Sequence, residues 1–125
     1  MKILIVDDDM VYRFVASRMM SLIDSSLVVE ESENGQKGLA KLENQKDSDE
    51  KTVVLLDINM PVLDGWEFLE QLKQNGFYNL SKLEIYVVSS STNESDILKA
   101  KQFDFIKGFI HKPLSKENIL AIING

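Results

Sequence analysis

Apolar and polar residues alternate along the chain in two patterns: short, nearly continuous apolar runs, and segments with an apolar residue every three or four positions. The run Lys2–Val6 is apolar after its first residue, which indicates a strand buried on both faces of a parallel sheet. Four further strand-like runs follow it. The predicted strands are Lys2–Val6, Leu27–Glu31, Thr52–Leu56, Leu83–Ser89 and Gly108–Ile110.

A segment with helical spacing follows each predicted strand. After the first strand, Val11, Val15, Arg18-Met19 and Leu22 recur at helical intervals, and Asp8 or Asp9 is available to cap the helix. The other predicted helices are Gln36–Glu43 after an Asn34-Gly35 turn, a helix with Trp66, Leu69 and Leu72 on one face that ends at Asn75-Gly76, the segment Asn93–Gln102, and a closing helix from Ser115 through Ile119, Ile122 and Ile123.

Five strand–helix units in alternation predict an α/β fold. Such units form a parallel sheet with helices on both faces and right-handed connections. For five strands the natural arrangement is flavodoxin-like and doubly wound, with strand order 2-1-3-4-5. We interpret the polar stretch Asn44–Lys51 as a solvated loop, because a buried strand follows it directly. We therefore expect one domain over residues 1–125.

The composition fits a small globular domain. Of the 125 residues, 44% are hydrophobic and 27% are charged, which is ordinary for such proteins. No apolar run approaches the roughly 20 residues that span a bilayer. The absence of cysteine excludes disulfides and thiolate metal sites, and the net charge of −6 disfavours direct binding of nucleic acid. We expect a cytoplasmic protein that binds neither nucleic acid nor membrane.

Chemically reactive residues stand where four of the predicted strands end. Asp7 and Asp8 follow the first strand, Asp57 follows the third, Ser89 ends the fourth and Lys112 follows the fifth. Parallel strands place their carboxyl ends at one edge of the sheet, and this order puts strands one and three side by side at the switch point. The sequence therefore predicts that acids, a hydroxyl and an amine converge there.

This set of side chains is suited to phosphoryl transfer. Three carboxylates near one point repel one another and should raise at least one pKa, unless a hard cation such as Mg²⁺ is bound. Lys112 could pair with Asp57 when that carboxylate is bare and with a phosphoryl oxygen when one is present, and Ser89 could donate to the same oxygen. In this interpretation Asp57 is the acceptor carboxylate.

Each residue also has a simpler interpretation. Taken singly, the Asp7–Asp9 triplet is explained by helix capping, Asp57 by a turn and Ser89 by a loop, and an isolated lysine such as Lys112 is most often a surface residue. Helix capping alone does not readily explain why four strand ends carry chemically compatible groups. The interpretation of all four together as a phosphoryl-transfer site is therefore favoured. His111 is the only histidine, which excludes a multi-histidine metal site.

Four motifs in order resemble the receiver domain of two-component response regulators, and the resemblance covers essentially the whole chain. They are Ile3-Leu4-Ile5-Val6-Asp7-Asp8-Asp9, Leu55-Leu56-Asp57-Ile58-Asn59-Met60-Pro61 followed by Asp64-Gly65, Val87-Val88-Ser89-Ser90, and Phe109-Ile110-His111-Lys112-Pro113-Leu114. The resemblance implies that Asp57 accepts a phosphoryl group from a phosphohistidine of a sensor histidine kinase or phosphotransfer protein. It implies a signalling module that acts only on itself and not an enzyme with an external substrate.

The resemblance also implies a magnesium site. Asp8 and Asp57 would hold Mg²⁺ directly, the backbone carbonyl of Asn59 would be the third protein ligand, and Asp7 would act mostly through water. Asn59 and Ser91, two positions beyond the acceptor and the switch serine, are where such domains commonly tune hydrolysis of the acyl phosphate.

A conformational switch is implied as well. Phosphorylated Asp57 would attract the Ser89 hydroxyl, and Phe109 would turn inward into the space vacated by the loop after strand four. The face formed by the fourth helix, fifth strand and fifth helix would then change its affinity for a partner, or for a second copy in a homodimer. Lys112 matches the motif lysine, which is usually joined to Pro113 by a cis bond.

Two features depart from the family pattern. Phe109 lacks the hydroxyl of the tyrosine that is common at its position. The segment Phe103–Lys107 contains aromatic residues where a small turn rich in Gly and Ala is usual, and we expect these aromatics to pack locally instead of forming a docking patch. The chain reads as a single-domain regulator, although one cut from a longer protein would read the same.

Two rival functions are weighed against the phosphoacceptor module. A haloacid-dehalogenase-like phosphohydrolase also uses an aspartyl nucleophile in an α/β fold, but it needs a second acid two residues later, where this chain has Asn59. A receiver-like interaction module that needs no phosphate is disfavoured by the intact set of Asp8, Asp57, Ser89 and Lys112.

Overall fold

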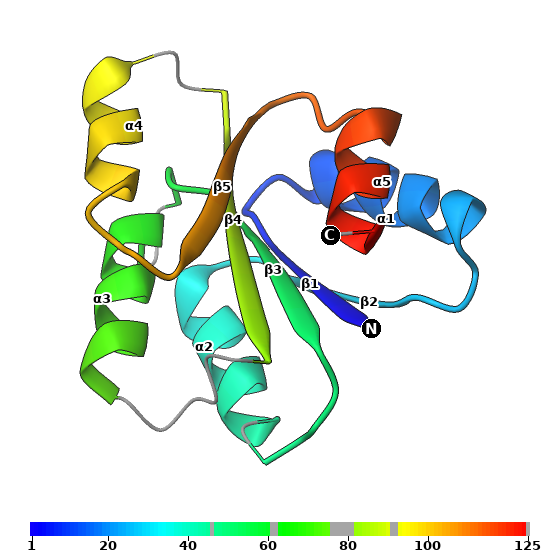
Figure 1. Ribbon diagram of the computed structural model, residues 1–125, viewed down its shortest axis with the longest axis horizontal. Coiled ribbons are helices and arrows are strands. Elements are labelled where there is room, and N and C mark those ends of the chain that lie inside the picture. Colours follow the sequence, from blue (N-terminus) through cyan, green and yellow to red (C-terminus); the bar gives the residue numbers. More distant parts are fainter. Residues whose placement is uncertain (46, 61–62, 76–81, 91–92, 125) are drawn as a thin grey trace.

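The protein folds into one parallel sheet with helices on both faces (Figure 1). The computed structural model describes residues 1–45, 47–60, 63–75, 82–90 and 93–124. Its elements are β1 (Lys2–Val6), α1 (Met10–Ile23), β2 (Val28–Ser32), α2 (Gly35–Asn44), β3 (Thr52–Leu56), α3 (Gly65–Asn75), β4 (Leu83–Ser89), α4 (Glu94–Ala100), β5 (Ile106–His111) and α5 (Lys116–Asn124). The strand order is β2-β1-β3-β4-β5 and all pairs are parallel, so the predicted flavodoxin-like α/β fold is confirmed.

The core has two layers, one on each face of the sheet. Side chains of a strand alternate between faces, so Leu4 and Val6 of β1 point to one layer and Ile3 and Ile5 to the other. Helices α2 and α3 cover the first layer and α1 and α5 the second, as Figure 1 shows. Strands β1 and β3 are therefore buried on both sides, as their apolar runs predict.

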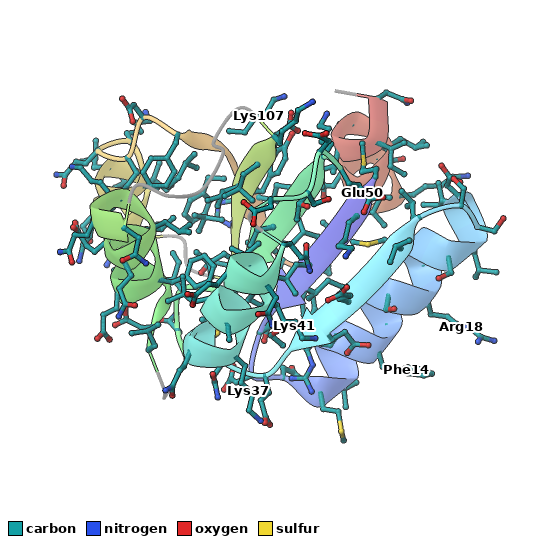
Figure 2. All side chains as sticks on the ribbon, turned by 90° about the horizontal axis from the view of Figure 1, so that it is seen from below. Phe14, Arg18, Lys37, Lys41, Glu50 and Lys107 are labelled. Atoms are coloured by element: carbon teal, nitrogen blue, oxygen red, sulfur yellow. The ribbon has the colours of Figure 1, made fainter. Side chains whose placement is uncertain are left out.

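Helix α1 buries a different face from the one that its apolar spacing suggests. Val11, Val15 and Leu22 are exposed, while Ala16 and Met20 are buried against the sheet. Figure 2 shows the neighbouring side chains of Phe14 and Arg18 pointing outward from this helix. The helix has two apolar stripes, and periodicity alone does not say which one meets the sheet. Asp9 is the cap, because its carboxylate accepts hydrogen bonds from the backbone N–H groups of Val11 and Tyr12.

The largest differences from the predicted element bounds are at β5 and α4. Strand β5 is twice the predicted length, because it also includes Ile106, Lys107 and His111; Ile106 pairs with Ile85 and His111 with Ser89, with a register shift at Ile85/Tyr86. Helix α4 is shorter than predicted, and Asn93 caps it instead of lying inside it. The prediction for the aromatic segment before β5 is confirmed, since Phe103 is 7% exposed and packs in the core. No helix in the described ranges is long and apolar enough to cross a membrane.

Gly65, the first residue of α3, is packed directly against the chain that carries Asp57. A Cβ atom at this position would lie 2.7 Å from the Ile58 Cα and 2.8 Å from the Asp57 carbonyl oxygen. The Gly65 N–H also donates to the Ile58 carbonyl at 2.9 Å. The contacts are with backbone, so a side chain here would displace the segment that follows β3.

We predict that Gly65→Ala lowers the free energy of unfolding by about 1 to 3 kcal/mol, as overpacking typically does. Urea denaturation measures this loss. Gly108→Ala is the control: its Cβ would meet only the Tyr86 ring, at 3.3 Å, and a ring can shift. Equal stability of Gly65→Ala and the wild type would show that the segment accommodates the methyl group.

Candidate functional site

Four strand ends meet at the carboxyl edge of the sheet, and backbone hydrogen bonds continue across them. The Asp7 N–H donates to the Ser32 carbonyl at 3.0 Å, and the Asp57 N–H donates to the Val6 carbonyl at 2.9 Å. The Lys112 N–H donates to the Ser89 carbonyl at 3.0 Å. These bonds fix the residues just beyond β1, β3 and β5 at the same edge of the sheet, as the predicted strand order requires.

Three carboxylates lie together at this edge. Each of Asp7, Asp8 and Asp57 offers an oxygen, and these atoms lie within 4.8 Å of one another. Asp7 is 1% and Asp57 6% exposed, whereas Asp8 is exposed. The cluster therefore has two buried members and one that faces solvent.

Lys112 supplies the positive charge beside this cluster. Its Nζ atom lies 2.7 Å from Asp7 Oδ2 and 3.8 Å from Asp57 Oδ1. The sequence suggested pairing with Asp57, but the shorter contact is with Asp7. Asp7 is the more deeply buried acid, and a buried carboxylate needs a partner most. Lys112 thus bridges both acids and lies within reach of either.

The environment raises the pKa of Asp57 from its ordinary value of 3.8 to about 6. Burial is the main cause, because it disfavours the charged carboxylate, and the negative charges of Asp7 and Asp8 add to it. The Lys112 ammonium and the Asn59 N–H, which donates to Asp57 Oδ1 at 3.4 Å, act in the opposite direction. The clustered acids therefore contribute to the rise in pKa, as expected, but burial contributes more.

The residues present fit a hard divalent cation. Three acids face one another with a single ammonium, Lys112, in contact with them among the described residues. Carboxylate oxygens of this kind are the ligands that Mg²⁺ prefers. Bound Mg²⁺ would reduce the repulsion that now raises the pKa of Asp57.

The expected switch residues lie on the neighbouring strands β4 and β5. Ser89 is fully buried and pairs in register with His111, and Phe109 is half-buried, pairs with Val87 and packs its ring edge-on against the exposed His111. The Lys112-Pro113 bond is cis, as the family resemblance implies. Asn59 is exposed next to the acceptor, while Ser91 lies outside the described residues.

Sequence reasoning missed two residues of α1 that reach this site. The Lys112 Nζ atom lies over the Tyr12 ring, 4.4 Å from its centroid. The Arg13 guanidinium donates to the Asp7 carbonyl at 2.6 Å and to Glu31 at 3.2 Å. One signal was available: both residues fall in the first turn of the helix that begins directly after the Asp7–Asp9 triplet.

The raised pKa of Asp57 should make the metal-free protein less stable as pH rises. The folded state holds this proton up to about pH 6 and the unfolded state only to about pH 4, so the free energy of unfolding falls between these values and stays lower above them. In EDTA at pH 7.5, Asp57→Asn should therefore be more stable than the wild type by about 1 to 3 kcal/mol.

Urea denaturation at several pH values measures this effect. The gain should shrink toward pH 4, where wild-type Asp57 is protonated in both states. Asp104→Asn, at an exposed position far from the cluster, should show no such trend. A gain from Asp57→Asn that stays constant from pH 4 to 7.5 would contradict the raised pKa.

Known proteins resemble this chain along nearly its whole length. The family model of the response regulator receiver domain matches residues 3–124. The nitrate/nitrite response regulator protein NarL of Escherichia coli is 30% identical over 122 residues, which are 98% of this chain and 52% of that protein. The chain thus spans about half the length of this relative. Protein PilH of Pseudomonas aeruginosa is 28% identical over 123 residues, 98% of this chain and 94% of PilH.

Solved structures agree with these matches. Chemotaxis protein CheY4 of Vibrio cholerae has a TM-score of 0.78 at 27% identity, and the match covers 98% of this chain and 95% of that one. A two-component response regulator from Cytophaga hutchinsonii has a TM-score of 0.87 at 24% identity, covering 98% and 93%, which supports the fold alone. Together, the family model, the relatives and the strand-edge cluster show that this chain belongs to the receiver domains of two-component response regulators.

Proposed function

We propose that residues 1–125 act as one phosphoacceptor switch, in which Asp57 receives a phosphoryl group from a phosphohistidine of a sensor histidine kinase or phosphotransfer protein. The observation that supports this best is the environment of Asp57. Its carboxylate is buried at the end of β3, is clustered with two further acids and has the Lys112 ammonium at 3.8 Å. A carboxylate in such surroundings can act as nucleophile toward phosphorus when the charge on the phosphoryl oxygens is neutralised.

In the transfer step, an oxygen of Asp57 forms a bond to phosphorus while the bond from phosphorus to the donor imidazole nitrogen breaks. The electron pair of that bond stays on the imidazole, which takes up a proton. Only unprotonated Asp57 has the nucleophilic electron pair, so its pKa of about 6 leaves most of it competent at neutral pH. Burial keeps competing water away from the carboxylate.

Charge neutralisation falls to the groups around Asp57. Asp8 and Asp57, with the Asn59 backbone carbonyl and with Asp7 through water, would hold Mg²⁺, which when bound offsets charge on the phosphoryl oxygens. Lys112 moves its ammonium from Asp7 toward a phosphoryl oxygen, a short displacement because it already lies between Asp7 and Asp57. The Ser89 hydroxyl donates to the same group, and Asn59 and Ser91 influence how fast water removes it.

In the proposed switch, a conformational change at Ser89 is transmitted to the surface of the protein. The Lys112 N–H bond to the Ser89 carbonyl joins the ends of β4 and β5, and Phe109 lies on β5 two residues before His111. Inward movement of Phe109 would alter the face of α4, β5 and α5, and Leu98 of α4 is exposed. We propose this face as the surface for a downstream protein or for a second copy of the chain.

The rival functions receive less support. Asn59, two residues after Asp57, has no carboxyl group to act as the acid or base of a phosphohydrolase. A phosphate-independent module would have no need for two buried carboxylates that raise a pKa and repel each other. Phosphoryl transfer explains both the cluster and the lysine that bridges it.

Phosphorylation at Asp57 is tested by incubating the protein with Mg²⁺ and acetyl phosphate and measuring its intact mass. We expect one phosphoryl adduct in the wild type, none in Asp57→Asn, and an adduct in the control Asp104→Asn. No wild-type adduct, or one that persists in Asp57→Asn, would contradict the proposal. Steady release of phosphate from unrelated monoesters without an adduct would favour the hydrolase.

Magnesium should stabilise the fold through the acid cluster. At about ten to a hundred times its Kd, Mg²⁺ should raise the free energy of unfolding by about 1 to 3 kcal/mol, and EDTA should reverse the gain. Urea denaturation with and without Mg²⁺ measures this. The gain should be mostly lost in Asp8→Asn and kept in Asp104→Asn. A wild-type stability that ignores Mg²⁺ would argue against the site.

A further inference from the structure

Tyr12 lies next to Lys112, whose ammonium contacts the acid cluster. It stands in the first turn of α1, and its ring face lies 4.4 Å from Lys112 Nζ. The ring belongs to the partly buried residues that pack against the core layer under α1 and α5. Lys112 is thus in contact with two carboxylates and with an aromatic face at the same time.

An aromatic ring can position the Lys112 ammonium without occupying its hydrogen-bond donors, which a further carboxylate would do. The lysine stem has four methylene groups, so its ammonium can occupy many positions unless something limits them. A ring attracts the charge through its electron-rich face and takes no hydrogen bond from it. All three N–H donors of Lys112 therefore stay available for Asp7, Asp57 and a phosphoryl oxygen.

The Tyr12 hydroxyl does not explain the position of this side chain. Its oxygen is buried and has no hydrogen-bond partner among the described residues. Burial, followed by the charges of Asp7 and Asp57, raises the pKa of Tyr12, so the phenol stays neutral at physiological pH. The hydroxyl makes no contact that holds Lys112, which leaves the ring as the part that acts on the site.

We propose that Tyr12 is a positioning residue whose ring face holds the Lys112 ammonium between Asp7 and Asp57 and guides it from one to the other. The proposal rests on the proposed function, because the movement of Lys112 matters only if Asp57 is phosphorylated. The competing explanation is that Tyr12 only fills space under α1. These two explanations differ in whether the effect of Tyr12 depends on Lys112.

A double-variant experiment separates them. The rate constant of phosphorylation by acetyl phosphate with Mg²⁺ is measured for Tyr12, Tyr12→Phe and Tyr12→Leu, each with Lys112 and with Lys112→Ala. With Lys112 present, Tyr12→Leu should be about 2- to 30-fold slower, the range of one cation–π contact, and Tyr12→Phe should keep the wild-type rate. With Lys112→Ala, the three residues at position 12 should give equal rates.

A second measurement examines the placement without phosphorylation. NMR should show the side-chain methylene protons of Lys112 next to its ammonium shifted upfield by the ring in the wild type and in Tyr12→Phe. This measurement does not need the Tyr12→Leu variant, so it remains possible if that variant does not fold. An upfield shift that is absent from the wild type would overturn the proposal.

Two kinetic outcomes would also overturn it. Equal slowing by Tyr12→Leu with Lys112 and with Lys112→Ala would mean that Tyr12 acts through packing alone. Slowing by Tyr12→Phe as large as that by Tyr12→Leu would mean that the hydroxyl carries the effect. Failure of the proposed function looks different: wild-type protein would gain no adduct at Asp57 while the Lys112 protons remained shifted.

Discussion

The structure depends on an imbalance of charge at the edge where β1 and β3 end. Three acids gather there, two of them buried, and among the described residues Lys112 is the one ammonium in contact with them. Burial without full neutralisation disfavours the charged carboxylate, and this raises the pKa of Asp57. A bound cation would therefore stabilise the charged carboxylates of this site, and Lys112 and Ser89 can donate hydrogen bonds to a bound anionic group.

The rest of the fold keeps this imbalance in place. Unbroken apolar strands in the middle of the sheet fix Asp7 and Asp57 side by side, and Gly65 lets α3 begin against the segment after β3. The β4–β5 ladder does the same for Ser89 and Lys112. The proposed switch uses this arrangement, because a change at Asp57 reaches β5 through residues already bonded to one another.

Much of this could be predicted from the sequence, because strand ends are fixed by where apolar runs stop. The positions of Asp57, Ser89 and Lys112 follow from that rule, and the strand order follows from the usual arrangement of five alternating strand–helix units. The buried face of α1 could not, since Val11 and Val15 form an apolar stripe as regular as the one that packs on the sheet. The pairing of Lys112 with Asp7 and its contact with Tyr12 depend on side-chain directions, which no periodicity encodes.

The central claim is that Asp57 itself carries the phosphoryl group, and chemical trapping tests it most directly. Borohydride reduces an acyl phosphate to an alcohol, so a phosphorylated aspartate becomes homoserine. After phosphorylation by a protein that carries phosphohistidine, followed by reduction and peptide mass spectrometry, homoserine should appear at position 57 and at no other aspartate. Homoserine at Asp7 or Asp8, or at no position in a protein that has gained phosphate, would contradict the account.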